Sequence, residues 1–259
     1  MLVRSPSSVV LNCEVFGRCA LKIDRWFYSL AGVIALAAVV IGFHDFILHG
    51  EGAGGRVIGP KMFALDATHG MCVGLWFVLF LVQSLLIASK NRRIHLKLGW
   101  AGAVIGLSVV VTGFWVTTQS VIVHSPKMPI VGMLYSQFLL LMYAEIALFT
   151  VFATLGILTR KKPRIHRPAM LMASMSLLPA ATTRMPFVDP IFGNGGWVRI
   201  FGPMLALGAL LLVVRWMMTR SVDRWLAMSY GSLAVVLIGA TELARTSAWG
   251  ALAALILKR

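Results

Sequence analysis

The chain has 259 residues, of which 59% are hydrophobic and only 13% are charged. A soluble domain carries roughly 45–50% apolar and about 25% charged residues, so this composition excludes an ordinary soluble globule, a disordered tail and a collagen-like chain. The 24 Lys and Arg residues outnumber the 9 Asp and Glu residues, for a formal net charge of +15. A polytopic membrane protein concentrates basic residues in its cytoplasmic loops, so this excess does not by itself indicate a nucleic-acid partner.

The first 25 residues are polar and basic and contain no long apolar core. A cleaved signal peptide has such a core, so we expect instead a cytoplasmic N-terminal segment over 1–25. The rest of the chain, 26–259, shows no linker or low-complexity stretch and is predicted to be a single transmembrane helical domain.

Seven stretches are apolar over about the 20 residues that a helix needs to cross a bilayer. They are continuous rather than alternating, and backbone amides must be satisfied within lipid, so we predict helices and not barrel strands. The sequence therefore predicts an all-α polytopic membrane helix bundle with about seven transmembrane helices. In chain order these spans are 26–48, 63–89, 98–120, 132–159, 168–187, 200–218 and 225–243, the last continuing into, or breaking before, an apolar tail at 246–257.

The basic residues predict the orientation of these spans. The side that holds the N-terminus receives 16 Lys and Arg residues, and the opposite side receives 8. Short basic loops mark the cytoplasmic side, so the N-terminus is predicted to be cytoplasmic and the protein to lie in the cell inner (plasma) membrane. No basic folded domain remains that could bind nucleic acid, so the expected partners are the lipid bilayer and other membrane subunits.

The histidines near the outer ends of the spans form the first candidate site. His44 lies at the end of the first span beside Asp45, and His69 lies near the start of the second. Two neutral imidazoles at one depth on adjacent helices can hold a haem iron axially. The same cluster, with His49 and Asp66, could instead hold zinc or copper, or form hydrogen bonds with no metal at all.

The histidines at the inner ends form the second candidate site. His95 opens the third span and His166 opens the fifth, so both lie in the same leaflet. The glycines at 99, 102, 106 and 113 fall on the face of His95 at 100° per residue, which leaves room for a flat macrocycle. Close helix packing explains the same glycines, and binding of anionic lipid headgroups explains the same basic loops.

Glu145 lies in the middle of the fourth span, where a carboxylate is costly unless it is protonated or paired. Arg184 and Arg215 are its candidate partners. Such a residue could relay protons or bind a cation in a transporter, or form a hydrogen bond to a neighbouring helix.

Residues 65–113 resemble part of the transmembrane ascorbate-reducible cytochrome b family. The resemblance rests on Leu65-x3-His69-x2-Cys72, on the apolar run from Phe77 to Gln83, and on His95-x3-Gly99 with its glycine-rich helix. In that family, histidines at the outer start of one helix and the inner start of the next ligate two haems. The resemblance implies that His69 is an outer ligand and His95 an inner one. It leaves His44 or His124 as the second ligand of the outer haem. His166 is suitably placed to be the second ligand of the inner haem, with His95.

A looser resemblance covers 60–185 and is to uncharacterised bacterial multi-pass membrane proteins. These carry a His-led helix ending in Gln, a His-x-x-Leu-Gly loop and a later His-Lys-Arg-Leu-Met loop, which here reads His166-Arg-Pro-Ala-Met170. This resemblance implies no activity.

The residues thus favour a redox protein that binds haem b between helices and takes part in electron transfer. His44, His69, His95 and His166 would ligate iron, and Arg92, Arg93 and Arg164 would favour the haem propionates and raise the potential. The alternative is a non-catalytic accessory or scaffolding subunit of a larger membrane complex. A transporter that uses Glu145 is a third hypothesis.

Overall fold

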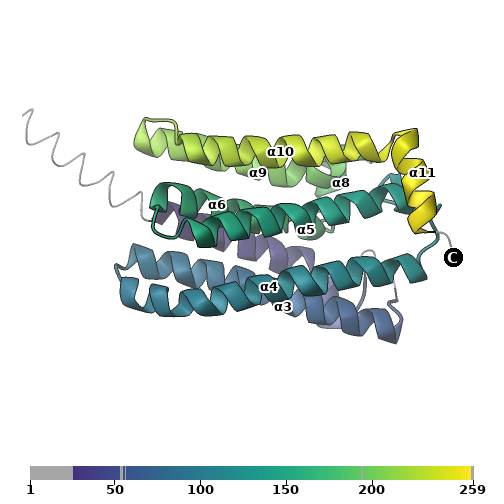
Figure 1. Ribbon diagram of the computed structural model, residues 1–259, viewed down its shortest axis with the longest axis horizontal. Coiled ribbons are helices and arrows are strands. Elements are labelled where there is room, and N and C mark those ends of the chain that lie inside the picture. The colour runs from purple at the N-terminus through teal and green to yellow at the C-terminus, as the bar shows by residue number, and fades with distance from the viewer. Residues whose placement is uncertain (1–25, 53–54, 56, 194, 258–259) are drawn as a thin grey trace, which may run out of the picture.

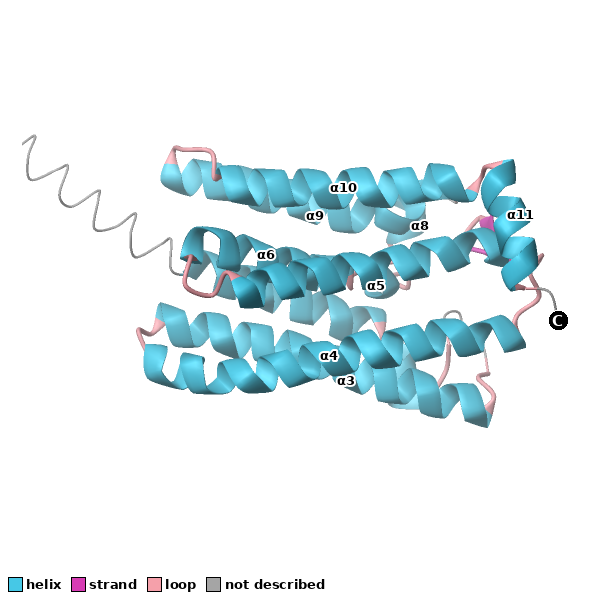
Figure 2. Cartoon of the chain, in the orientation of Figure 1, coloured by secondary structure: helices cyan, strands magenta, loops and turns pink. Residues whose placement is uncertain are grey.

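The computed structural model describes residues 26–259 except 53–54, 56, 194 and 258–259. The predicted N-terminal segment 1–25 lies outside the described residues. The described part is built from helices and one short hairpin, in which β1 (Pro129–Ile130) pairs antiparallel with β2 (Met133–Leu134). Figure 2 shows the long helices running side by side, with the turns that join them at the two ends of the bundle.

Five of the helices are long and apolar enough to cross a membrane. They coincide with five of the seven predicted spans and confirm the prediction of an all-α bundle that can cross a bilayer several times. The five are α3 (Pro60–Ala88), α4 (Arg92–Val123), α5 (Tyr135–Leu158), α9 (Gly196–Thr219) and α10 (Arg224–Ala244).

The other two predicted spans are interrupted. The first helix, Trp26–Gly42, ends in a turn at Phe43, after which α2 (His44–His49) begins. The fifth stretch divides into α6 (Pro163–Ser176) and α7 (Pro179–Thr182), because Pro179 has no backbone N–H to continue the helical ladder. Seven uninterrupted spans are therefore not confirmed.

The C-terminal apolar tail is a separate helix. α10 ends at Ala244, and α11 (Ser247–Ile256) begins after a break. The side chain of Thr246 caps α11 by accepting a hydrogen bond from the backbone N–H of Trp249 at 3.3 Å. The remaining short helix, α8 (Val188–Phe192), precedes α9.

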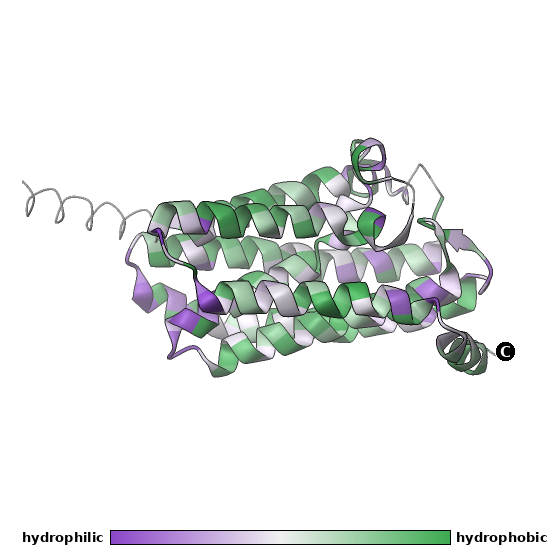
Figure 3. Cartoon of the chain, turned by 90° about the horizontal axis from the view of Figure 1, so that it is seen from above, coloured by the Kyte–Doolittle hydropathy of each residue, from purple (hydrophilic) through white to green (hydrophobic). Residues whose placement is uncertain are grey.

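The helices alternate in direction, so the turns α3–α4, α5–α6 and α9–α10 lie at one end of the bundle (Figure 1). Hydrophilic residues gather at the ends and hydrophobic residues lie between them (Figure 3). We call the end with these three turns the basic end. Its basic residues are Lys90, Arg92, Arg93, Lys97, Arg160, Lys161, Lys162, Arg164, Arg167, Arg215, Arg220 and Arg224.

The centre of the bundle is organised around α6. Ala169, Ala173 and Ser174 of this helix are fully buried, and their small side chains let neighbouring helices approach closely. The buried indole of Trp76 on α3 donates a hydrogen bond to Ser174 Oγ at 3.1 Å. The same indole meets the ring of Phe149 on α5 edge to face, with centroids 4.8 Å apart. Trp76 thus joins α3, α5 and α6.

The first helix packs against the α6–α7 segment through Gly42. A Cβ atom at Gly42 would lie 2.7 Å from the backbone carbonyl carbon of Ala181. Real Cβ atoms do not approach so closely, so the two segments can touch only because residue 42 has no side chain.

We predict that Gly42→Ala destabilises the fold by about 1–3 kcal/mol, because the new methyl group pushes against the backbone of Ala181. The matched control is Gly74→Ala on α3, where a Cβ meets nothing within 4 Å. That change is expected to be neutral or to stabilise by up to about 1 kcal/mol, since alanine favours a helix. Thermal unfolding followed by circular dichroism in detergent measures both, and equal effects would contradict the close contact.

Candidate histidine site at the basic end

His95 and His166 lie together at the basic end. His95 is the fourth residue of α4, and His166 is the fourth residue of α6. Their ring centroids are 6.3 Å apart and the ring planes are inclined by 83°. The structure therefore brings this predicted pair together from two separate helices.

Each imidazole lies beside a backbone carbonyl near the end of the preceding helix. The Nδ1–H of His166 donates to the carbonyl of Gly156 on α5 at 2.8 Å. His95 lies beside the carbonyl of Gln83 on α3. Because a carbonyl can only accept, the bond to Gly156 places the proton of neutral His166 on Nδ1 and leaves Nε2 free to ligate a metal.

Two buried polar atoms at this site have no hydrogen-bond partner within the described chain. They are Nδ1 of His95 and Oε1 of Gln83. Buried polar atoms are nearly always hydrogen-bonded, so these two atoms can take a partner from ordered water or from a bound group. Gln83 was not among the ligands predicted from sequence, although it ends the apolar run of the cytochrome b resemblance.

The site is built from two similar helical hairpins. Arg93-Ile94-His95 begins the second helix of the α3–α4 hairpin, and Arg164-Ile165-His166 begins the second helix of the α5–α6 hairpin. The repeated Arg-Ile-His triplet is a signal in the sequence that was available to pair these two histidines. The sequence contained no such signal for Gly156, because every residue type carries a backbone carbonyl.

The spacing of the two rings suits axial ligation of one metal. A metal about 2 Å from one nitrogen of each ring places the centroids about 6 Å apart, which agrees with the observed 6.3 Å. Gly99, one turn below His95, faces open space, since a Cβ built there meets nothing within 4 Å. Gly99 is exposed, so this side of His95 opens to the surface of the bundle and leaves room beside the ring.

The rest of the glycine face is closed, which corrects the prediction of a continuous open groove. Side chains of α3 fill it because α3 and α4 pack as a hairpin. In turn, Leu79 lies against Gly102, Trp76 against Gly106 and His69 against Gly113.

The outer pair is not assembled as predicted. His69 Nδ1 lies 2.9 Å from Thr112 Oγ1 on α4. The Thr112 hydroxyl donates to the carbonyl of Ser108 at 2.6 Å, so its oxygen accepts from His69. His44 is exposed on α2 with its Nδ1 3.1 Å from Asp45. Within the described residues, His69 is turned to α4 and forms no ring contact with His44.

The outer cluster also gathers too few donors for zinc or copper. The His44 ring lies 6.2 Å from that of His49, with Asp45 as the neighbouring carboxylate partner of His44. Across residues 26–52, 55, 57–193 and 195–257, no three His, Cys, Asp or Glu side chains are placed to hold one metal ion. His124 stacks on Tyr135 at 5.0 Å and is likewise not joined to His69.

The predicted arginines separate into two groups. Arg92 lies near enough to His95 for a Coulombic interaction. Arg167 interacts in the same way with both His95 and His166, although it was not predicted as a site residue. Arg93 is exposed beside them. Arg164 lines a different cavity, together with Arg167.

Glu145 is partly buried on α5, and the nearby charge that attracts it is Arg184. The guanidinium of Arg184 also lies over the ring of Phe43 at 4.5 Å. Arg215, the other predicted partner of Glu145, instead interacts with Asp223.

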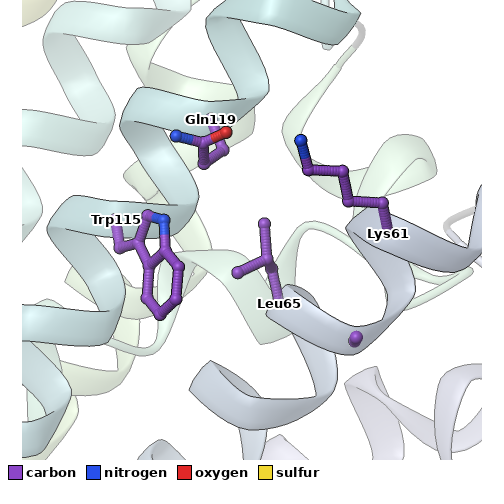
Figure 4. Close-up of a pocket in the computed structure, with 5 residues that line it drawn as sticks. Lys61, Leu65, Trp115 and Gln119 are labelled. Carbon is purple, nitrogen blue, oxygen red and sulfur yellow. The ribbon is translucent and has the colours of Figure 1, made fainter.

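A cavity of about 400 Å³ lies at the opposite end of the α3–α4 hairpin. Figure 4 shows Lys61 and Leu65 of α3 facing Trp115 and Gln119 of α4 across this space. Neither His95 nor His166 lines it, so it is separate from the histidine site.

Comparisons with protein-family models, curated proteins and solved structures find no match to this chain. The resemblance to the cytochrome b family therefore remains one of short motifs.

Proposed function

We propose that this chain is an integral membrane redox protein that binds haem b between His95 and His166 and takes part in electron transfer. The observation that carries the proposal is the pairing of two imidazoles from separate hairpins, with centroids 6.3 Å apart. The open space at Gly99 and the orphaned Nδ1 of His95 support it.

A haem held by two imidazoles supplies one-electron transfer when it is bound. The chain contributes the ligands and their orientation. The carbonyl of Gly156 holds the His166 ring in one tautomer, and such an outer-shell partner makes the ligating nitrogen more basic. The carbonyl of Gln83 lies beside the His95 ring, but Nδ1 of His95 has no partner in the described chain.

The basic end supplies positive charge to this site. Arg92, Arg93 and Arg167 would attract carboxylates at the edge of a bound macrocycle and favour the reduced state of a nearby centre. In this proposal Arg164 has no such role, because it lines the neighbouring cavity.

We also propose that the basic end faces the cytoplasm and that the membrane is the inner (plasma) membrane. The concentration of Lys and Arg in three short turns supports this orientation. In this arrangement α6 with α7, and the Trp26–Gly42 helix with α2, provide two interrupted crossings beside the five continuous ones.

One observation favours the alternative role as an accessory subunit. Only 11% of the most apolar window of α4 is buried, against 44% for α9. The exposed face of α4 carries Trp100, Leu107 and Phe114. Lipid covers such a face in a monomer, and another membrane subunit would cover it in a complex.

We predict that the purified protein shows Soret and α bands in a reduced-minus-oxidised spectrum. His95→Ala and His166→Ala should each abolish the same component, since each removes one ligand of a shared iron. His44→Ala and His49→Ala are the controls and should retain it, because these rings lie on α2. If the gently purified wild-type protein shows no bands, the haem proposal is wrong and the role as an accessory subunit remains.

We further predict that Gly99→Leu abolishes the same bands without removing a ligand, because the side chain fills the open space below His95. Gly231→Leu, on α10 and equally open, is the matched control and should keep full haem content. Haem per protein is measured by pyridine haemochrome assay, with circular dichroism to verify folding. Normal haem content in folded Gly99→Leu would mean that the macrocycle does not occupy this space.

A further inference from the structure

The C-terminal helix α11 lies across the end of the bundle that is opposite the basic end. Figure 1 shows α11 running crosswise to α5 and α10, and Figure 3, turned by 90°, shows the helix beside the C-terminus end on. Its 10 residues rise about 15 Å, which is half of the roughly 30 Å of a hydrocarbon core. A helix of this length and direction cannot cross the bilayer, although it is apolar throughout apart from Ser247.

Contacts with α5 hold α11 in this direction. The indole N–H of Trp249 donates a hydrogen bond to the backbone carbonyl of Ser136, in the first turn of α5, at 2.8 Å. Trp249 and Ala253, which lie one turn apart, are the buried residues of α11. The helix is therefore docked along one edge, and every other residue of Ser247–Ile256 is exposed.

Two features place α11 at the boundary between the acyl chains and the headgroups. With 24 residues α5 is about 36 Å long, so its first turn, where Trp249 docks, lies near the edge of a roughly 30 Å hydrocarbon core. In the break before α11, Nη1 of Arg245 lies 3.4 Å from Oε1 of Glu242, and both side chains are exposed. Exposed charged groups are costly in hydrocarbon, so this break lies at the polar level of the membrane.

The exposed surface of α11 has two unlike sides. At about 100° per residue, Leu252, Leu255 and Ile256 fall on one side of the helix, which we call the large side. Gly250 and Ala254 fall on the other, which we call the small side. The three residues of the large side are each about half exposed or more. A Cβ built at Gly250 meets nothing within 4 Å, so the small side faces open space.

The same exposed apolar character begins on α10. Leu243, in the last turn of α10, is exposed like the large side of α11, and α10 is long and apolar enough to cross a membrane. Acyl chains cover the exposed apolar side chains of such a helix. A helix that lies in the plane of the interface buries one apolar side in the same layer and leaves its other side to water.

We propose that α11 is an interfacial helix that binds the phospholipids of the leaflet opposite the basic end. Its large side is inserted among the acyl chains, and its small side faces the aqueous phase. Through its contacts with α5 and its connection to α10, it fixes the depth at which these two helices lie in the bilayer. The helix and the histidine site are at opposite ends of the bundle, and neither proposal depends on the other.

The test measures the surroundings of both sides of α11 in the full chain, reconstituted in phosphatidylcholine nanodiscs. Leu252→Cys and Ala254→Cys each carry one NBD fluorophore, in a background in which the three native cysteines are replaced by serine. Val235→Cys, exposed in the middle of α10, is the control for depth. The quenchers are iodide in water, a shallow nitroxide near the carboxyl end of the lipid acyl chain, and a deep nitroxide near its methyl end.

The label at Leu252→Cys is expected to be quenched several-fold more strongly by the shallow nitroxide than by the deep one. The label at Val235→Cys should show the reverse order. Iodide should quench the label at Ala254→Cys several-fold more strongly than the label at Leu252→Cys, because the two side chains lie on opposite sides of the helix.

Equal quenching by iodide at residues 252 and 254 would overturn the proposal, because both sides of α11 would then have the same surroundings. Protection of residue 252 from iodide and from both nitroxides would also overturn it, since a protein surface such as a second copy of the chain would cover the large side. Stronger quenching by the deep nitroxide there would overturn the interfacial depth. If Leu252→Cys does not fold, Leu255→Cys, on the same side, replaces it with the same expectations. A wild-type protein without haem bands would leave these expectations unchanged, so the two proposals fail separately.

Discussion

The burial of α6 among α3, α5 and α10 is the constraint on which the rest of the structure depends. In lipid there is no hydrophobic driving force between helices, so close packing and interhelical hydrogen bonds must hold the bundle together. The small residues Ala169, Ala173 and Ser174 allow this packing, and Trp76 completes it with a hydrogen bond from α3. This fixed position of α6 is what carries His166 across to His95.

Some polar atoms of the histidine site have hydrogen-bond partners within the described residues, and others do not. His166 is oriented by the carbonyl of Gly156, whereas Nδ1 of His95 and Oε1 of Gln83 are buried without partners in the described chain. A bundle optimised for stability alone would satisfy or replace such groups, because an unpaired buried polar atom costs about 1–3 kcal/mol. Under the proposed function, a bound haem at the imidazole pair would offset that cost.

The arginines of the basic end lie in two different environments. Arg92 and Arg93 begin α4 on the surface, and Arg92 contributes to the field around the His95 imidazole. Arg215 is instead enclosed with Asp223 and two aromatic rings, and Arg164 and Arg167 complete a cavity around it. The Arg215 side chain is largely buried, so its charge is less sensitive to screening by salt than those of the exposed Arg92 and Arg93. The net charge of the chain does not distinguish exposed arginines from buried ones.

Hydropathy and charge in the sequence determined the all-α membrane class and five of the spans. They also determined that His95 and His166 lie at one end of the bundle. The class, the spans and this placement depend on residue type and helical period alone. Tertiary packing decided which partners each face meets. It filled the glycine face of α4 with Leu79, Trp76 and His69, and it turned His69 to Thr112 instead of His44. Helical period identifies the face on which a residue lies, but the neighbour that fills that face depends on how distant segments pack, which no local pattern contains.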